Sequence, residues 1–301
     1  MAMTAAEFAL FLEPKLSNIW HNVGDPVASK YSRVMNIRDM NKNTVTDAKL
    51  GGFGAMQTQP DGDSVTYDDP LAPISKAYTY AVKALGYKVQ ERLWMNDLYD
   101  EVERFEEDLR DSANDDVETS GANVFNNGFG TTNVGFDGLA LFSASHTRLD
   151  AGAVQSNRPA TDEALSLSAL HNAIVSIHKW KNDRGRPRNY GNKLTLLVPS
   201  DLIVTAQELV TAELQPGTAL NTKNVLNKFG IGEVLEWQHL TSTTAWFLVG
   251  DKHDVNFLWR YRTKSATETD FDTDTMKRKV RHAYATGFGE WRGVYGTDGV
   301  A

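Results

Sequence analysis

The sequence predicts a mixed α+β fold, and three observations support this class. Segments with the three- and four-residue spacing of amphipathic helices are interspersed with short runs rich in Val, Tyr, Phe and Trp, which is typical of strands. Apolar residues make up 41% and charged residues 23% of the chain, the balance of a globular protein. Helices dominate the middle of the chain and strands dominate its final third, so we expect the two kinds of element to be segregated.

Composition excludes several functional classes. The chain contains no cysteine, which excludes disulfides, thiol catalysis and cysteine-ligated zinc or iron–sulfur clusters. No apolar run approaches the roughly 18 residues of a membrane-spanning helix, and the first residues lack the basic start of a signal peptide. We therefore expect synthesis in the cytoplasm and no membrane partner. A formal net charge of −8 opposes broad adhesion to nucleic acid.

The opening stretch AEFALFLEPKLSNIW, residues 6–20, predicts an amphipathic helix, interrupted near Pro14, that docks on a neighbour. Its apolar residues follow steps of three and four along the chain. They are Phe8, Leu12, Leu16, Ile19 and Trp20.

Residues 31–73 predict an extended hairpin with a glycine-rich tip. Two stretches, SRVMNIR and DSVTYDD, have the composition of strands and flank the tip. A loop of this length without a helix is uncommon inside a compact domain, and its backbone groups need partners. We expect another subunit to supply them. The turn-forming residues are Gly51, Gly52, Gly54, Pro60, Gly62, Pro70 and Pro73.

A strand or bent strand pair is expected over residues 74–94, with a bulge at Gly86. A long helix follows at about 97–118, where Asn96 is placed to cap its start and acidic residues outnumber arginines by eleven to two. One face of this rod is predicted to be buried and the other strongly anionic. Its buried stripe includes Phe105, Leu109, Ala113 and Val117, and Gly121, Asn126, Asn127 and Gly128 are expected to end it.

The rest of the chain predicts two further helices and a series of strands. One helix lies within 165–189 and stops at the turn formed by Gly185 and Pro187, and another opens at Pro199 and Ser200 and runs through Leu214. Residues 218–230 have the composition of a loop. Strands are expected within 193–198, 232–240, 244–251, 255–262, 277–288 and 291–296.

Ser145, His146 and Asp150 lie within six positions and have the composition of a nucleophilic triad. A triad is defined by geometry, and its members normally come from distant segments. The stretch SASHT also lacks the flanking glycines of a nucleophile elbow. We favour a polar turn with local hydrogen bonds, and a hydrolase that uses Ser145 and His146 stays as the alternative.

Other candidate ligand sites have more ordinary interpretations. His171 and His178 share a helix face but lack an accompanying metal-binding motif, so half-buried histidines are favoured. The run GGFG is not followed by the Gly-Lys-Ser/Thr of a phosphate-binding loop. The acidic helix lacks the loop spacing of calcium binders. We therefore expect no catalytic residue, no cofactor and no metal.

Two basic patches, at residues 179–188 and 277–281, have two interpretations. They contact DNA phosphates, or they pair with the anionic helix of a neighbouring copy, and the negative net charge favours the second. The residues that we expect at subunit contacts are Gly51, Gly52, Phe53, Gly54, Glu103, Glu106, Glu107, Arg184, Arg186, Arg188, Lys277 and Arg278.

The order of several segments resembles the major capsid proteins of tailed bacteriophages, in particular the head subunits of the Mu-like group with the Hong Kong 97-like coat fold. The segments are DGLALFSASHT, the helix that ends in NDRGRPRN, LTLLVPSDLIVTAQELV, NVLNKFGIGEVLEWQHL, TAWFLVGD and DTDTMKRKVRHAYATGFGEWRGVYGT. This resemblance covers about the last 165 residues by motif and the earlier part by segment order. These are packing motifs, and their order is more specific than any one of them.

The resemblance implies an architecture and a role. It implies an N-terminal arm at 1–30, an extended hairpin loop at 31–73, a peripheral domain at 74–140 and 255–301 with a spine helix, and an axial domain at 141–254. It also implies a structural subunit that assembles as hexamers and pentamers into an icosahedral virion capsid around double-stranded DNA. The main partner is then other copies of the same chain. The packaged DNA is contacted weakly, and scaffold, portal or decoration proteins are possible further partners. The alternatives are an encapsulin-like nanocompartment shell, which shares the fold, and a DNA-binding module.

Overall fold

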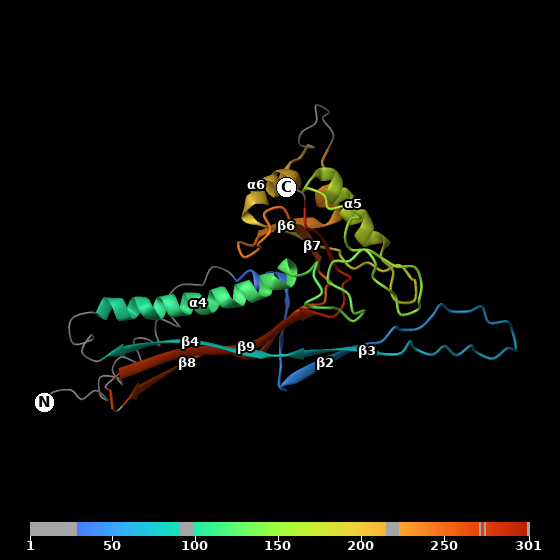
Figure 1. Cartoon of the computed structure of the whole chain (residues 1–301). Coiled ribbons are helices and arrows are strands. Elements are labelled where there is room, and N and C mark those ends of the chain that lie inside the picture. The colour runs from blue at the N-terminus through green and yellow to red at the C-terminus, as the bar shows by residue number, and fades with distance from the viewer. Residues whose placement is uncertain (1–28, 91–98, 215–222, 271, 274, 300–301) are drawn as a thin grey trace.

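The computed structural model describes residues 29–90, 99–214, 223–270, 272–273 and 275–299, and these form a mixed α+β molecule (Figure 1). The expected N-terminal helix at 6–20 and the Asn96 cap lie outside these ranges. The long helix α4 lies along one sheet, a second sheet with helices α5 and α6 stands above it, and the β2–β3 hairpin projects to one side (Figure 1).

The described elements follow one another in a simple order. The helices are α2 (Tyr31–Val34), α4 (Tyr99–Asn126), α5 (Leu167–Lys179) and α6 (Ile203–Thr211), with the 3-10 turns η1 (Ser200–Leu202) and η2 (Leu226–Phe229). The strands are β1 (Asn36–Asp39), β2 (Thr44–Lys49), β3 (Ile74–Thr79), β4 (Ala81–Gln90), β5 (Leu194–Val198), β6 (Ile231–Glu236), β7 (Trp246–Gly250), β8 (Val255–Asp270), β9 (Thr275–Phe288) and β10 (Val294–Thr297).

The first four-stranded sheet has the order β1-β8-β9-β4, and α4 covers one of its faces (Figure 1). Strand β9 alternates between the two faces, as a strand with one covered side must. Arg278, His282 and Tyr284 all bond to side chains of α4, whereas Lys279 and Arg281 lie on the exposed face. The alternation therefore decides which basic residues of 277–281 meet solvent.

The second four-stranded sheet has the order β10-β7-β5-β6 and packs against α5 and α6. Ser166 caps α5, since its hydroxyl accepts a hydrogen bond from the Ala169 N–H at 3.2 Å. Strand β10 pairs with β7 in antiparallel register. The range 255–301, expected as part of one domain with 74–140, is therefore divided between the two sheets, because its last strand crosses to the upper one.

The hairpin strands differ from the expected ones. The paired strands are β2 and β3, which run from Thr44 opposite Thr79 to Lys49 opposite Ile74. Of the first expected strand, at 32–38, residues 32–34 lie in the short helix α2, and residues 36–38 form a strand, β1, that pairs with β8 and not within the hairpin. Residues 63–69, the second expected strand, form no strand. Residues 63–69 have strand composition but no ladder partner, and composition alone does not supply one.

Two glycines, Gly86 and Gly121, have roles in the structure that differ from the predicted bulge and helix end. Gly86 sits in continuous register opposite Lys279, and a Cβ there would lie 2.4 Å from the Arg278 carbonyl oxygen, so this glycine permits close backbone approach and marks no bulge. Helix α4 passes through Gly121 and ends at Asn126, which is one of the residues expected to end it and lies eight residues beyond the expected bound of 118. A Cβ at Gly121 would lie 3.0 Å from that of Tyr31, so tight packing explains the residue.

Candidate functional site

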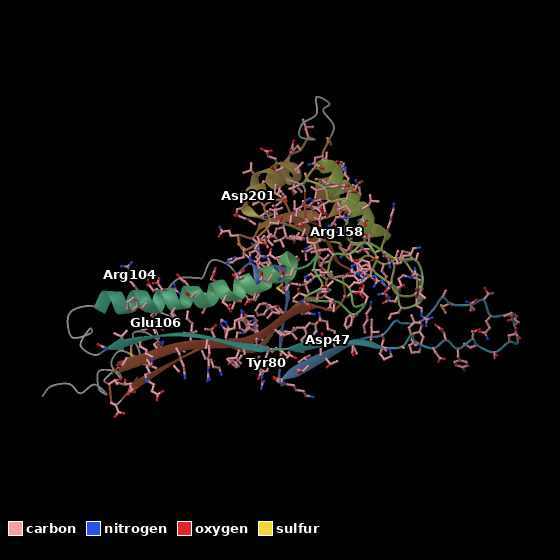
Figure 2. The ribbon with its side chains drawn as sticks, viewed as in Figure 1. Asp47, Tyr80, Arg104, Glu106, Arg158 and Asp201 are labelled. Carbon is pink, nitrogen blue, oxygen red and sulfur yellow. The ribbon has the colours of Figure 1, made fainter. Side chains whose placement is uncertain are left out.

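The hairpin beyond its paired strands is the most exposed described part of the chain. Residues 55–70 are all exposed, and Met56 and Tyr67 are 99% and 92% accessible. Figure 2 shows the hairpin extending away from the rest of the molecule. The stretch from 50 to 73 contains four aspartates, two of them near the tip at Asp61 and Asp63, and no lysine or arginine. Exposed apolar side chains in an extended acidic loop are typical of a surface that binds another molecule.

The root of the hairpin is held by the basic loop that follows α5. The Arg184 guanidinium donates from Nε to the Gly52 carbonyl at 3.3 Å and from Nη2 to the Asp69 carbonyl at 2.5 Å. It therefore bridges the two legs of the hairpin. Arg186 donates to the Phe53 carbonyl from the same side. We call these contacts the clasp, since they fix where the hairpin leaves the body.

A cluster of charges beneath the clasp anchors strand β2. The Lys49 ammonium lies 2.6 Å from an Asp183 carboxylate oxygen and also binds Glu290. Arg292, which is buried, reaches the same two carboxylates at 3.3 and 2.8 Å. Two cations and two anions offset one another here, which removes most of the cost of burying them.

The structure brings most of the residues expected at subunit contacts together within one chain. Gly51 is buried against Leu71, while Gly52 and Phe53 accept bonds from the clasp. Gly54 donates its N–H to Asp68, across the two legs, at 2.5 Å. The basic loop therefore binds the hairpin of its own chain through Arg184 and Arg186. Arg188 is exposed.

Glu106 and Arg278 are a correction to the expected contacts. They form one buried ion pair, with side chains 0% and 3% exposed and an Nη2–Oε1 distance of 2.6 Å. The Tyr87 hydroxyl also donates to Glu106 at 3.0 Å. Burial and this carboxylate raise the pKa of Tyr87. The two charged groups bind one another and join α4 to the sheet within one subunit, so neither faces another subunit.

Helix α4 turns the expected residues Leu109, Ala113 and Val117 inward, but Glu106 takes the buried place that was expected for Phe105. Phe105, assigned to the buried stripe, is half exposed, whereas Glu106 is buried together with Leu109 and Ala113. The spacing from 106 to 109 and 113 is that of one helix face, and this spacing could have identified Glu106 from the sequence. Glu107 is partly exposed, and the side chain of Glu103 lies outside the described ones.

A second set of bonds joins α4 to the sheet at Asp116. This carboxylate binds the Lys83 ammonium at 2.7 Å, the Tyr284 hydroxyl at 2.6 Å and the His282 ring at 2.9 Å. Burial by itself raises the pKa of Asp116, but the bonds from its three partners outweigh burial and lower it. At the far end of β9, Lys277 pairs with Asp270, 2.5 Å away.

Ser145, His146 and Asp150 do not form a catalytic triad. The His146 ring is buried, with Nδ1 2.6 Å from Asp137 and Nε2 3.1 Å from Asn157, so both nitrogens are occupied. Asp150 instead binds Arg148 at 2.6 Å. No ring nitrogen remains to accept the Ser145 proton, which removes the hydrolase alternative for these residues.

The buried His146 has a structural role. The Asn157 amide group donates to two backbone carbonyls, at 2.7 and 3.0 Å, so its oxygen is the atom that faces His146. Asp137 and this oxygen are both acceptors, so each ring nitrogen of His146 faces an acceptor atom inside the protein. The ring stacks on Trp291 with centroids 4.3 Å apart. Burial opposes it, but the bond and charge of His146 lower the pKa of Asp137.

Other expected ligand positions have no assembled site. His178 is exposed and His171 is half-buried on the same helix. Within the ranges that the structure describes, no three side chains of His, Asp or Glu gather closely enough to hold a metal ion. The described helices also include none that is both long and apolar enough to span a membrane.

Comparisons with known proteins agree with this architecture. A comparison with curated proteins gives no match. The chain superposes on the capsid of the cyanophage P-SCSP1u with a TM-score of 0.60 at 9% identity, covering 92% of this chain and 90% of that one. For the capsid of an empty GTA particle the TM-score is 0.58 at 9% identity, with coverage of 97% and 96%. For Microbacterium phage Oxtober96 it is 0.52 at 13% identity, with coverage of 99% and 98%.

These likenesses show a shared fold. The family is shown by sequence, because the family model described as phage capsid protein matches residues 73–297, which is most of the chain. The matched range includes α4, both four-stranded sheets except β1, and the basic loop of the clasp. The chain belongs to the phage capsid protein family.

Proposed function

We propose that this chain is the major capsid protein of a tailed phage, of the Mu-like group with the Hong Kong 97-like coat fold. It assembles as hexamers and pentamers into an icosahedral head that encloses double-stranded DNA, within the virion. Family membership supports the structural role. One observation carries the assembly role: residues 55–70 project into solvent with Met56 and Tyr67 exposed.

The mechanism is mechanical. The hairpin of one subunit lies across the next and buries its apolar side chains there, so each subunit both gives and receives one such contact. Such a head-to-tail contact generates rings when its rotation closes. Each contact is weak, but repetition over a closed shell makes the sum large. The clasp contributes by fixing the direction in which the hairpin leaves the body.

The proposed division keeps an N-terminal arm at 1–30, a hairpin loop at 31–73, a peripheral domain built on the spine helix α4, and an axial domain at 141–254. Strand β10 is added to the axial part, because it pairs with β7. DNA is contacted weakly, and scaffold, portal and decoration proteins are the further partners proposed.

The test is removal of the projecting segment. Replacing residues 55–67 by a short Gly-Ser-Gly bridge keeps the clasp, since Gly54 and Asp68 already approach one another. We expect a folded monomer that forms no particles in electron microscopy, while the unchanged chain forms closed shells with hexamers and pentamers. A matched control, Gln59→Ser, alters an exposed polar residue of the same segment and should assemble. Normal particles from the shortened chain would contradict the proposal.

A further inference from the structure

The face of the first sheet that turns away from α4 gathers basic side chains from three strands. Lys277, Lys279 and Arg281 alternate along β9 with residues that bond to α4, so they leave the sheet on its other side. Residues directly opposite on neighbouring strands share a face. The register therefore places Lys88 of β4 beside Lys277, and Lys264 of β8 beside Arg281. We call these five residues the cationic face.

Most of the charge on the cationic face is not offset within the subunit. Lys277 pairs with a carboxylate at the end of β8 and lies opposite Glu268. In the part of the chain that the structure describes, the other four cations form no ion pair. Lys264 lies directly opposite Arg281, and Lys88 directly opposite Lys277, and like charges in such positions repel one another. An anionic partner would offset this repulsion.

The cationic face also has an apolar edge. Val82 precedes Lys83, whose ammonium binds Asp116 of α4, so Val82 itself lies on the side of the cations. It is 57% exposed. The residues between the cations are small, with Ala84 opposite Arg281 and Ala266 opposite Lys279. The surface therefore suits an extended segment that carries both carboxylates and apolar groups.

The projecting hairpin has this composition. The Asp63 N–H donates to the Pro60 carbonyl at 3.2 Å and closes the turn, which puts Asp61 and Asp63 at the tip. Residues 55–70 include no lysine or arginine. Val65 and Tyr67 follow Asp63 at alternate positions and are 58% and 92% exposed. In an extended segment, alternate residues share one face, so a carboxylate and two apolar groups are presented together.

A subunit cannot place the hairpin on its own cationic face. Strand β4 continues from β3 away from the hairpin, and the hairpin and the free end of β4 point to opposite sides of the molecule (Figure 1). A second copy in head-to-tail arrangement brings the two together. We propose that the cationic face of one subunit receives the hairpin of the next, with the tip aspartates against Lys279 and Arg281 and an apolar side chain on Val82. This inference rests on the proposed function, because it names the surface that receives the hairpin.

Two other anionic partners are less complementary. A DNA backbone offers phosphates but no apolar group for Val82, and the net charge of −8 opposes its approach. The helix α4 of a second copy has several of its carboxylates already bound within its own subunit. They are those of Asp111, Asp115, Asp116 and Glu118. In the described structure the carboxylates at the hairpin tip bind no cation, so they remain available.

A cross-link tests where the hairpin lands and leaves every charge in place. The chain has no cysteine, so introduced thiols have no competitors. Chains with Ser64→Cys are mixed with chains with Ala266→Cys, assembled and oxidised, and the linked peptides are identified by mass spectrometry. We expect a disulfide between the two chains. Ser265→Cys is the matched control, because Ser265 is the exposed neighbour on the α4 side of β8, and it should link at least about tenfold less.

Charge reversal tests why the hairpin lands there. Lys279→Glu with Arg281→Glu should abolish particles in electron microscopy, and Asp61→Lys with Asp63→Lys should do the same. All four changes together should restore the particles, because the attraction is then re-formed with opposite signs. The control, Lys279→Arg with Arg281→Lys, keeps the charge and should assemble. In the unassembled subunit, the double glutamate variant should unfold at a higher urea concentration, since a glutamate then faces Lys264.

Several results would overturn the inference. If the double glutamate variant forms normal particles while the shortened hairpin forms none, the hairpin keeps its role and the cationic face loses its own. Particles from the shortened chain would instead remove the proposed function. Normal shells that package less DNA would assign the cationic face to DNA. Equal linking of Ser265→Cys and Ala266→Cys would show that the hairpin does not select this face, and a lower urea midpoint would show that its cations already have partners.

Discussion

Replacing Arg278 by methionine tests whether the Glu106–Arg278 pair acts inside one subunit. Arg278 donates three bonds to Glu106, of 2.6 to 3.2 Å, and one to Thr267 of 2.6 Å. Methionine fills part of the space but leaves the Glu106 carboxylate buried without the guanidinium that offsets its charge, while the Tyr87 hydroxyl still donates to it. Losing one partner of such a pair costs about 3–5 kcal/mol, because the other charge stays buried.

The double variant supplies the comparison. Glu106→Met combined with Arg278→Met removes both charges, and replacing a buried pair by apolar residues is often close to neutral. We therefore expect Arg278→Met alone to lower the free energy of unfolding by about 3–5 kcal/mol, and the double variant to recover most of that loss. Urea unfolding of the monomer, followed by circular dichroism, measures both values. Lys279→Met, on the exposed position next to Arg278, is the matched control and should leave stability unchanged.

One result would refute this reasoning. If Arg278→Met unfolds at the same urea concentration as the unchanged chain and yet forms no particles, then the residue acts between subunits, as the sequence suggested. Equal destabilisation by the single and double variants would instead show that lost packing, and not the loss of the Arg278 charge beside Glu106, sets the cost.

Three more outcomes are expected. Arg184→Ala releases the clasp, so hydrogen exchange at the hairpin root should become at least about tenfold faster by mass spectrometry, whereas Arg188→Ala should not change it. The pKa of Asp137 is lowered on folding, so its stabilisation is present above the ordinary value of 3.8 and is lost as pH falls through the folded value; Asp137→Asn should therefore flatten the acid side of the stability curve. Gly121→Ala should cost about 1–3 kcal/mol in urea unfolding, because its Cβ meets packed neighbours, whereas Gly232→Ala meets open space.

Each of these has a contradicting result. If hydrogen exchange at the hairpin root is unchanged in Arg184→Ala, then the pairing of β2 with β3 alone fixes the hairpin. If the free energy of unfolding of Asp137→Asn falls with decreasing pH as steeply as that of the unchanged chain, then the bond between Asp137 and His146 does not contribute to stability at acid pH. Equal stability of the two glycine variants would show that Tyr31 and its neighbours move aside at little cost.

The sequence by itself determined the fold class and most elements from residue 165 onward. Strands β5, β7, β8 and β9 and helices α5 and α6 lie within or overlap the predicted ranges, because apolar periodicity and capping act over a few residues. It also indicated an extended hairpin, through the lack of helix and the density of Gly and Pro. Strand β3 lies inside the strand range expected at 74–94, but its pairing with β2 was not predicted, since the paired residues are 25 to 35 positions apart.

Only the tertiary structure decided which charges meet. Glu106 and Arg278 are 172 positions apart, and Arg184 and Gly52 are 132 apart. Composition identifies such residues as acidic or basic but not which of them is buried, because burial is set by the face that a packed helix or strand presents. The same holds for Gly121 and His146, whose roles follow from neighbours brought close by folding. Local pattern therefore specified the elements, and long-range packing specified the contacts.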